Sequence, residues 1–137
     1  MKVFTNGCFD VLHRGHVELL SYCANIGEVV VGLNSDKSVK RLKGNSRPIN
    51  NQEDRRIILE SIKYVSKVII FEEDTPYELI KILKPDLIVK GGDYLPNEVV
   101  GHDLSEVRIF DTLQGYSSTA TIKSLLADLN FTENYRE

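Results

Sequence analysis

The feature that most constrains the fold of this chain is a set of short apolar runs that recur along its length. Each run is nearly continuous in apolar side chains and several are rich in β-branched residues, which predicts strands buried on both faces. The runs are KVFTN (2–6), EVVVGLN (28–34), KVIIF (67–71), DLIVK (86–90) and VRIF (107–110).

Helical segments separate most of these runs. From about Gly15 the apolar residues recur at helical spacing, and Gly27 marks the end of that helix. A short helix capped by Ser35 follows the second run. Further helices are expected over 51–63 and 74–84, because capping residues precede helical apolar spacing in both.

The later helices carry more specific signals. The segment 51–63 places Ile58, Leu59 and Ile62 on one face, and Pro76 stands just inside the start of the next helix. The final helix carries an apolar stripe at positions i, i+3, i+4 and i+7: Ile122, Leu125, Leu126 and Leu129.

This alternation of strand and helix predicts one α/β domain spanning residues 1–137. We expect a Rossmann-like architecture, with a five-stranded parallel sheet covered by helices on both faces. In such sheets the ligand lies beyond the carboxyl ends of the strands.

Composition narrows the function classes further. The chain has a net charge of −3, which disfavours nucleic acid as a partner, and no apolar run is long enough to span a membrane. The start of the chain lacks the apolar run of a signal peptide, so a cytoplasmic protein is expected. Cys8 and Cys23 are read as small buried residues, and no metal ligand is assigned, because their spacing with His13 and His16 matches no closed zinc site.

The stretch NGCFDVLHRGHVELL (6–20) contains two of the three histidines, His13 and His16. They lie at i and i+3 where the first strand gives way to a helix, so both rings face the same side of a helix start. Free backbone N–H groups at that point favour an anion such as phosphate. The alternative is that His13 caps a turn and His16 packs as an ordinary half-buried ring.

Three other features are compatible with phosphate binding. Residues 37–47 carry five basic side chains and no acid, among them Lys43 and Arg47. The segment KGGDY (90–94) stands at the end of the fourth strand, and three residues with hydroxyl groups, 117–119, precede the last helix. The alternatives are a simple tight turn at 90–94 and ordinary helix caps at 117–119. Neither GxGxxG nor GxxxxGK[ST] is present, which excludes the usual dinucleotide fingerprint and the P-loop.

These motifs resemble those of the cytidylyltransferase-like nucleotidyltransferases, whose HxGH hallmark is here His13-Arg14-Gly15-His16. The resemblance covers roughly residues 3–126 and is greatest to the adenylyltransferase domain of ADP-heptose synthases. It rests on NGCFDVLHRGHVELL, LNSDKSVKRLKGNSRPIN, EDRRIILESI, FEEDTPYELI and PDLIVKGGDY.

The resemblance implies transfer of AMP from ATP to a sugar 1-phosphate such as heptose 1-phosphate, with release of pyrophosphate. His13 and His16 would then hold the triphosphate and stabilise charge on the α-phosphate, with Lys43 binding phosphates from the loop side. Arg47 would assist at the substrate. The residues implied to contact or frame the nucleotide are Asn6, Gly7, Cys8, Phe9, Asp10, Gly15, Arg55, Lys90, Gly91, Gly92, Asp93, Ser117, Ser118 and Thr119.

The resemblance also implies Mg²⁺, held mainly by nucleotide phosphates, and a homodimer. Two alternatives stay open at this point. One is a CTP-dependent cytidylyltransferase acting on glycerol 3-phosphate or a similar polyol phosphate. The other is a nucleotide-binding module without catalytic activity.

Overall fold

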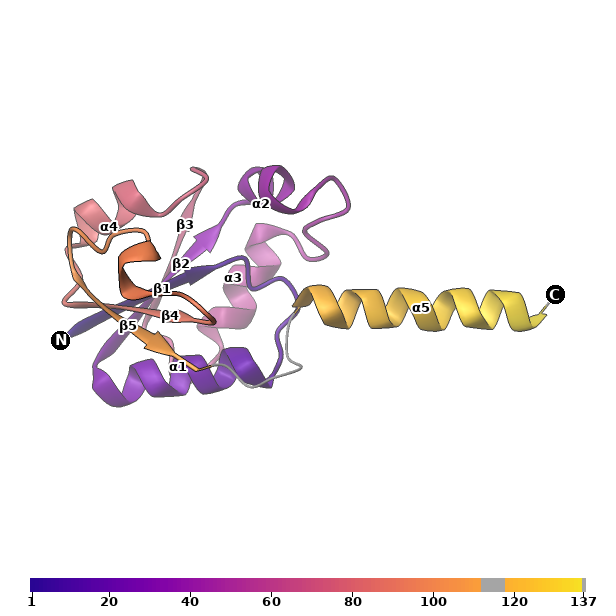
Figure 1. The fold of residues 1–137 in the computed structure, drawn as a ribbon, viewed down its shortest axis with the longest axis horizontal. Coiled ribbons are helices and arrows are strands. Elements are labelled where there is room, and N and C mark those ends of the chain that lie inside the picture. Colours follow the sequence, from indigo (N-terminus) through magenta and orange to yellow (C-terminus); the bar gives the residue numbers. More distant parts are fainter. Residues whose placement is uncertain (112–117, 137) are drawn as a thin grey trace.

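The sheet lies at the centre of the compact part of the molecule, from which α5 projects (Figure 1). The computed structural model describes residues 1–111 and 118–136, and side chains up to residue 128. Five parallel strands pair in the order β3-β2-β1-β4-β5. They are β1 (Lys2–Gly7), β2 (Glu28–Asn34), β3 (Lys67–Phe71), β4 (Leu87–Gly91) and β5 (Glu106–Phe110). The Rossmann-like, five-stranded parallel α/β domain predicted from the sequence is confirmed.

Helices connect most of the strands. Two of them lie between β2 and β3, and the link from β4 to β5 contains only a short 3₁₀ turn, so the alternation is less regular than the sequence indicated. The helical elements are α1 (Arg14–Ile26), α2 (Asp36–Lys43), α3 (Gln52–Glu60), α4 (Tyr77–Leu83), η1 (Pro96–Glu98) and α5 (Ser118–Arg136).

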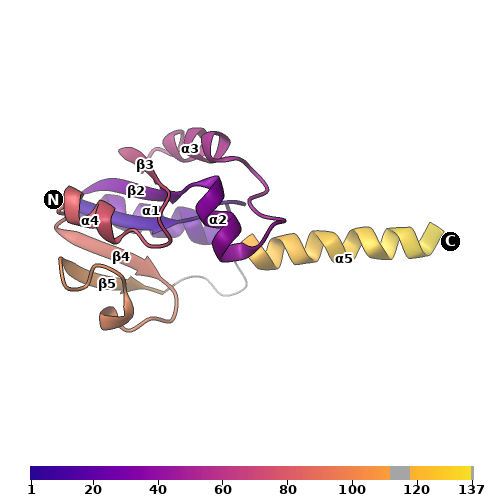
Figure 2. The ribbon, with the colours of Figure 1, turned by 90° about the horizontal axis from the view of Figure 1, so that it is seen from above.

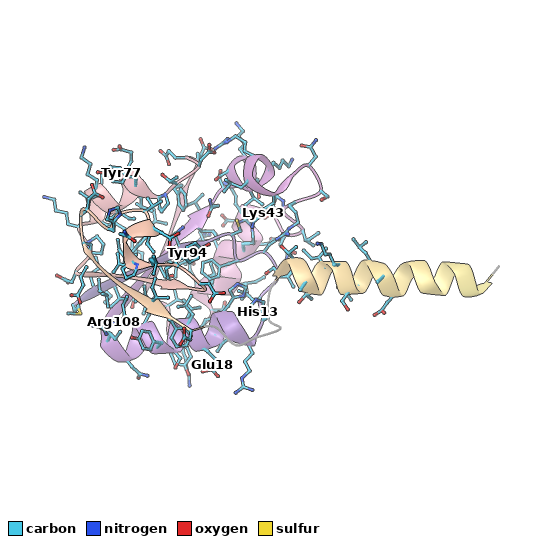
Figure 3. The ribbon with its side chains drawn as sticks, viewed as in Figure 1. His13, Glu18, Lys43, Tyr77, Tyr94 and Arg108 are labelled. Atoms are coloured by element: carbon cyan, nitrogen blue, oxygen red, sulfur yellow. The ribbon has the colours of Figure 1, made fainter. Side chains whose placement is uncertain are left out.

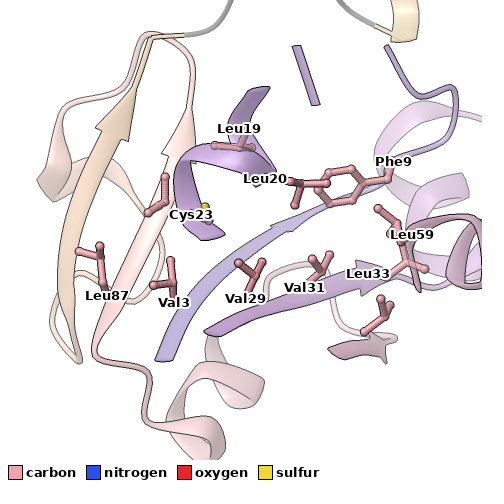
Figure 4. Close-up of a cluster of buried hydrophobic side chains, with 12 residues drawn as sticks. Val3, Phe9, Leu19, Leu20, Cys23, Val29, Val31, Leu33, Leu59 and Leu87 are labelled. Carbon is pink, nitrogen blue, oxygen red and sulfur yellow. The ribbon is translucent and has the colours of Figure 1, made fainter. Parts of the chain in front are cut away.

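Successive apolar side chains of each inner strand enter opposite layers, as the pleat requires. Val3 and Val29 lie in a buried cluster with Leu20 of α1 and Leu59 of α3 (Figure 4). Phe4, Val30 and Ile88 lie in a second cluster with Ile80 of α4 and Val99. The sheet is therefore covered on both faces, which explains the nearly continuous apolar strands.

Two helices differ from the sequence prediction. In α3 the buried side chains are Arg55 and Leu59, one turn apart, whereas Ile58 is 43% exposed, so the predicted face was wrong at Ile58. The reason is that α3 turns an arginine inward to bond backbone carbonyls. Pro76 is the N-cap residue of α4 rather than a residue inside it, because the helix begins at Tyr77.

Helix α5 leaves the body of the domain at the end toward which the strands point (Figures 1 and 2). The predicted stripe is helical as expected, but Leu125 and Leu126 are 58% and 54% exposed. Among the described residues, no helix combines the length and apolar character needed to cross a bilayer.

The strand order places the expected ligand site. From β1 the chain passes to β2 on one side and, through later elements, to β4 on the other. The carboxyl ends of β1 and β4 therefore flank the topological switch point, where open α/β sheets bind ligands.

Candidate active site

A cavity of about 630 Å³ opens at this switch point, within the size range of small-molecule sites. His13 and Lys43 come from different elements and both lie toward the end of the molecule from which α5 departs (Figure 3). Most of the residues predicted from the sequence line this cavity. They are Asn6, Gly7, Cys8, Phe9, Asp10, His13, Gly15, His16, Lys43, Arg47, Lys90, Gly91, Ser118 and Thr119.

Three predicted residues lie outside the lining of the cavity: Arg55, Gly92 and Asp93. Arg55 is only 1% exposed and lies beneath the site, and Asp93 is exposed to solvent. Ser117 falls outside the described residues. Whether the lining residues bind a nucleotide stays a prediction.

Other residues that line the cavity were not singled out from the sequence. Asn34 ends β2 and 74–76 follow β3, so the rule that ligands lie at the carboxyl ends of strands could have indicated them. Thr5 is 1% exposed, and its Oγ1 has no hydrogen-bond partner among the described residues, which points to a polar ligand atom or water. No sequence signal indicated Glu98, Val99 or Val100.

The two histidines are held by the start of α1. His13 is the N-cap residue, with extended backbone, and its ring stacks on that of His16 with centroids 3.9 Å apart. The backbone N–H of His13 donates to Nδ1 of His16 at 3.2 Å. Because Nδ1 accepts this bond, neutral His16 carries its proton on Nε2 and is a hydrogen-bond donor there.

Burial keeps the pair neutral. It lowers the pKa of His16 to about 4, with a smaller contribution from neighbouring His13, and it also lowers the pKa of His13. The alternative reading of the motif is thus partly true, since His13 does cap the helix and His16 is substantially buried. Both rings nevertheless line the cavity, so capping and ligand binding are compatible.

The turn after β1 places Phe9 against the histidines. Phe9 has a φ of 45°, a left-handed conformation that is rare for a bulky residue and costs about 1–3 kcal/mol. Its ring lies 5.2 Å from that of His16, centroid to centroid. A Cβ at Gly7 would come within 3.1 Å of the Phe9 ring, so a glycine at this position leaves room for the ring.

A buried ion pair follows Phe9. Arg47 Nε donates to Asp10 Oδ2 at 2.7 Å, and the side chains are 9% and 0% exposed. Asp10 also accepts from the backbone N–H groups of Ile49 and Asn50. Burial acts to raise the pKa of Asp10, but these N–H donors and Arg47 outweigh it, so its pKa lies below the ordinary value. Asp10 thus anchors the loop that follows α2.

Arg55 holds the turn after β1 and the loop before α3 through hydrogen bonds to their backbone. Its Nη1 donates to the carbonyls of Cys8 and Asn34 at 2.9 and 2.7 Å, and its Nε donates to the carbonyl of Asn50 at 2.9 Å. Nη2 pairs with Asp36 at 3.0 Å. The resemblance implied that Arg55 contacts or frames the nucleotide; its bonds to backbone carbonyls favour a role in orienting the loops around the cavity.

Lys90 and Tyr94 form the opposite wall. Lys90 Nζ lies 5.8 Å from the centroid of the Tyr94 ring, and Lys90 forms no ion pair with any described acidic residue. Burial lowers the pKa of Lys90; Cys8 acts in the opposite direction and Lys43 reinforces the decrease. Burial likewise raises the pKa of Cys8, against the opposing effect of Lys43, Arg55 and Arg47. A half-buried cation without a described counter-charge suits an anionic ligand.

The start of α5 closes the site on the side of the histidines. Ser118 Oγ donates to the carbonyl of Val11 at 2.5 Å, and Arg47 Nη1 donates to Thr119 Oγ1 at 3.4 Å. Both hydroxyls line the cavity. The helix start is therefore tied to the turn after β1 and to the Asp10–Arg47 pair.

The described residues contain no cluster of three or more His, Cys, Asp or Glu side chains arranged to hold a metal. The acidic side chains that line the cavity already accept hydrogen bonds. Asp10 accepts from Arg47, Asp74 from Arg41, and Glu98 from the backbone N–H of Leu95. A divalent cation would therefore depend mainly on oxygens brought by a ligand and on water.

Comparison with known proteins agrees with this geometry. The cytidylyltransferase-like family model matches residues 4–134. The chain belongs to the cytidylyltransferase-like family, and this match supports a nucleotidyltransferase.

Curated relatives are similar over nearly the whole chain. The "Bifunctional protein HldE" of a Nitratiruptor species is 59% identical over 125 residues, which cover 90% of this chain and 27% of that protein. The protein of the same name from Aliarcobacter butzleri is 56% identical, covering 90% of this chain and 26% of that protein. The chain thus spans about a quarter of the length of these relatives.

Solved structures share the fold. The lipopolysaccharide core biosynthesis protein from Thermoplasma volcanium aligns with a TM-score of 0.69 and 27% identity, covering 85% of this chain and 98% of that one. A macrolide-efflux protein from Streptococcus pneumoniae, at 21% identity and a TM-score of 0.65, covers 86% of this chain and 50% of that one. The second likeness concerns the fold alone.

Proposed function

We propose that this chain transfers AMP from ATP to a heptose 1-phosphate or a closely similar sugar 1-phosphate, releasing pyrophosphate. The observation that carries the proposal is the His13–His16 pair at the start of α1. The pair is kept neutral by burial, and His16 has its proton on Nε2. Such a donor stabilises charge on a phosphoryl group without adding a fixed charge.

The reaction is an in-line displacement. A phosphate oxygen of the sugar 1-phosphate attacks the α-phosphorus of ATP and forms a new P–O bond. The bond from that phosphorus to the bridging oxygen of the β-phosphate breaks, and its electron pair leaves with pyrophosphate. No covalent enzyme intermediate is needed, because the acceptor supplies the nucleophile.

Neutral and charged side chains of the site have different roles in this reaction. His16 and His13 donate hydrogen bonds to the α-phosphate as negative charge builds on its oxygens. Lys43 and Lys90, which both line the cavity, neutralise the remaining phosphates. Thr119 and the N-terminus of α5 receive the β- and γ-phosphates.

Mg²⁺ is part of the proposal. It would enter with the triphosphate and be coordinated by phosphate oxygens and water, because the acidic residues lining the cavity already accept hydrogen bonds. When bound, it supplies charge neutralisation to the phosphates. Chelation by EDTA should abolish turnover while leaving the fold unchanged.

The choice of acceptor is supported by relatives named HldE and by the Thermoplasma volcanium protein, whose name refers to lipopolysaccharide core biosynthesis. A cytoplasmic location and a homodimer stay predictions. The exposure of Leu125 and Leu126 on α5 supports self-association, which light scattering coupled to size exclusion would test.

The deciding experiment measures pyrophosphate release with Mg²⁺ and either ATP or CTP. Each nucleotide is paired with heptose 1-phosphate and, separately, with glycerol 3-phosphate. Turnover with ATP and the heptose is expected. Turnover with CTP alone would replace the proposal by the cytidylyltransferase alternative, and nucleotide binding without turnover in any pairing would favour the non-catalytic module.

A further inference from the structure

The turn between β1 and α1 contains an energetic conflict that the nucleotide site alone does not explain. Phe9 lies in the left-handed region with a φ of 45°, although glycine or asparagine would adopt that conformation at lower cost. Its side chain is 5% exposed, so the ring is fixed inside the protein. Strain of this kind persists only where surrounding contacts outweigh it, and it clusters at functional sites.

The contacts that outweigh the strain lie on both sides of Phe9. On one side the carbonyl of Cys8 accepts from Arg55 at 2.9 Å, and Arg55 is itself 1% exposed. On the other side the carboxylate of Asp10 accepts from Arg47, and the Asp10 carbonyl accepts from Asn50 Nδ2 at 3.1 Å. Because these partners come from residues 47–55, the turn is clamped by a distant part of the chain.

These contacts on either side of Phe9 fix the position of its ring. The Phe9 ring packs against His16 at 5.2 Å, tilted by 53°, while His13 stacks against His16 at 3.9 Å. The Nδ1 atom of His16 is held by the backbone N–H of His13. The imidazole is thus fixed by two neighbouring rings and by one of its nitrogens, which leaves Nε2 as its free donor.

We propose that Phe9 is a positioning residue for His16, and that buried Arg55 and Asp10 hold the backbone on either side of Phe9 so that its ring fixes the His16 imidazole. Phe9 then acts through His16 and not through a polar contact of its own. The catalytic part of this inference rests on the proposed nucleotidyl transfer, whereas the positioning part does not.

The first test is Phe9→Leu, which keeps an apolar side chain but removes the ring. We expect kcat to fall between about tenfold and 100-fold, with KM for ATP changed by less than about threefold, because misplacing a catalytic group weakens transition-state contacts most. Circular dichroism should show the same fold. A kcat within twofold of the wild type would overturn the inference.

The second readout does not depend on activity. Imidazole ¹⁵N shifts distinguish the Nε2–H from the Nδ1–H tautomer, and loss of a signal in His16→Gln assigns the His16 resonances. The wild type should show one Nε2–H tautomer, and Phe9→Leu should show a mixture. An unchanged His16 signature in Phe9→Leu, with activity falling only in proportion to the folded fraction, would mean a merely structural role and would overturn the inference.

Arg55→Lys provides an independent variant, since a lysine amine cannot reproduce a guanidinium fork that bonds three carbonyls. We expect it to shift the His16 signals in the same direction as Phe9→Leu. The matched control is Arg56→Lys, the next residue of α3, which pairs with Glu53 and Glu60 at the surface. Equal effects of the two substitutions would overturn the inference. If the wild type transfers no nucleotide, the tautomer signature still decides the positioning role.

Discussion

The turn after β1 and the turn after β4 flank the same cavity but are stabilised in different ways. At β1, Cys8 and Asp10 are bonded by buried arginines, and the strained Phe9 between them is fixed. At β4, Lys90 lies over the ring of Tyr94 with no ion pair to a described acid, and Tyr94 is 46% exposed. The turn after β1 is thus held by the chain's own groups, whereas Lys90 at the β4 edge carries a charge that an anionic ligand would neutralise.

This difference corresponds to two tasks. Donors that stabilise a transition state are most effective when their orientation is fixed before reaction, which suits the β1 edge. A half-buried lysine without a described counter-charge lowers stability but attracts phosphate, which suits binding at the β4 edge. Substitutions at the two edges should therefore have different effects on stability and on kinetics.

The largest effect on stability should come from Asp10→Ala. Removing the carboxylate leaves Arg47 charged and buried, and breaking such a pair costs about 3–5 kcal/mol. Urea unfolding followed by circular dichroism measures this loss. Asp93→Ala, at an exposed acid of the β4 turn, is the control and should change stability by less than about 0.5 kcal/mol.

A double variant sharpens that comparison. Asp10→Leu combined with Arg47→Met removes both charges, so it should be more stable than Asp10→Ala alone. A double variant that is no more stable than the single one would show that the cost arises from packing and not from the unpaired charge.

Lowering the pH should decrease the free energy of unfolding by a somewhat smaller amount. The pKa of His16 is about 4 in the folded protein against an ordinary value of 6.5, so the unfolded chain binds the proton first as pH falls. The free energy of unfolding should thus decrease by about 3 kcal/mol from this group between pH 6.5 and pH 4. Asp10 contributes at lower pH, since its pKa lies below the ordinary 3.8.

His16→Gln should flatten the stability profile in that window, as measured by urea unfolding at several pH values. The same slope in wild type and variant would mean that His16 is not buried neutral in solution.

The smallest expected effect separates binding from stability at the β4 edge. Lys90→Met should raise KM for ATP about tenfold, because a charged hydrogen bond to phosphate is lost. Its free energy of unfolding should be unchanged or higher, since a half-buried charge without a described ion-pair partner is removed. Lys81→Met, on the exposed face of α4, is the control. A Lys90→Met protein that is less stable but has normal KM would contradict this division of roles.

The strands could be predicted from the sequence within about one residue, because apolar runs of this length identify buried strands without knowledge of distant contacts. The cavity could be located in part, since His13 and His16 follow β1 and Lys90 lies near the end of β4, and these strand ends meet at one edge. The resemblance to nucleotidyltransferases added residue roles that spacing alone left open.

The remaining features depend on contacts between residues far apart in the chain. Arg55 reaches a carbonyl 47 positions away, and Arg47 pairs with an acid 37 positions away, so neither partner is visible in a local pattern. The inward turn of Arg55 also explains why the predicted face of α3 was wrong at Ile58. The exposure of Leu125 and Leu126 could not be inferred, because an apolar stripe predicts a helix but does not identify the surface that packs against it.

The central claim is that the neutral His16 donor stabilises the transferring phosphoryl group, and pyrophosphate release by His16→Ala tests it most directly. With ATP, heptose 1-phosphate and Mg²⁺, kcat should fall by about two to three orders of magnitude, as on losing one oxyanion donor. His102→Ala, which alters a histidine outside the cavity, should retain normal turnover. Near-normal turnover by a folded His16→Ala protein would contradict the account.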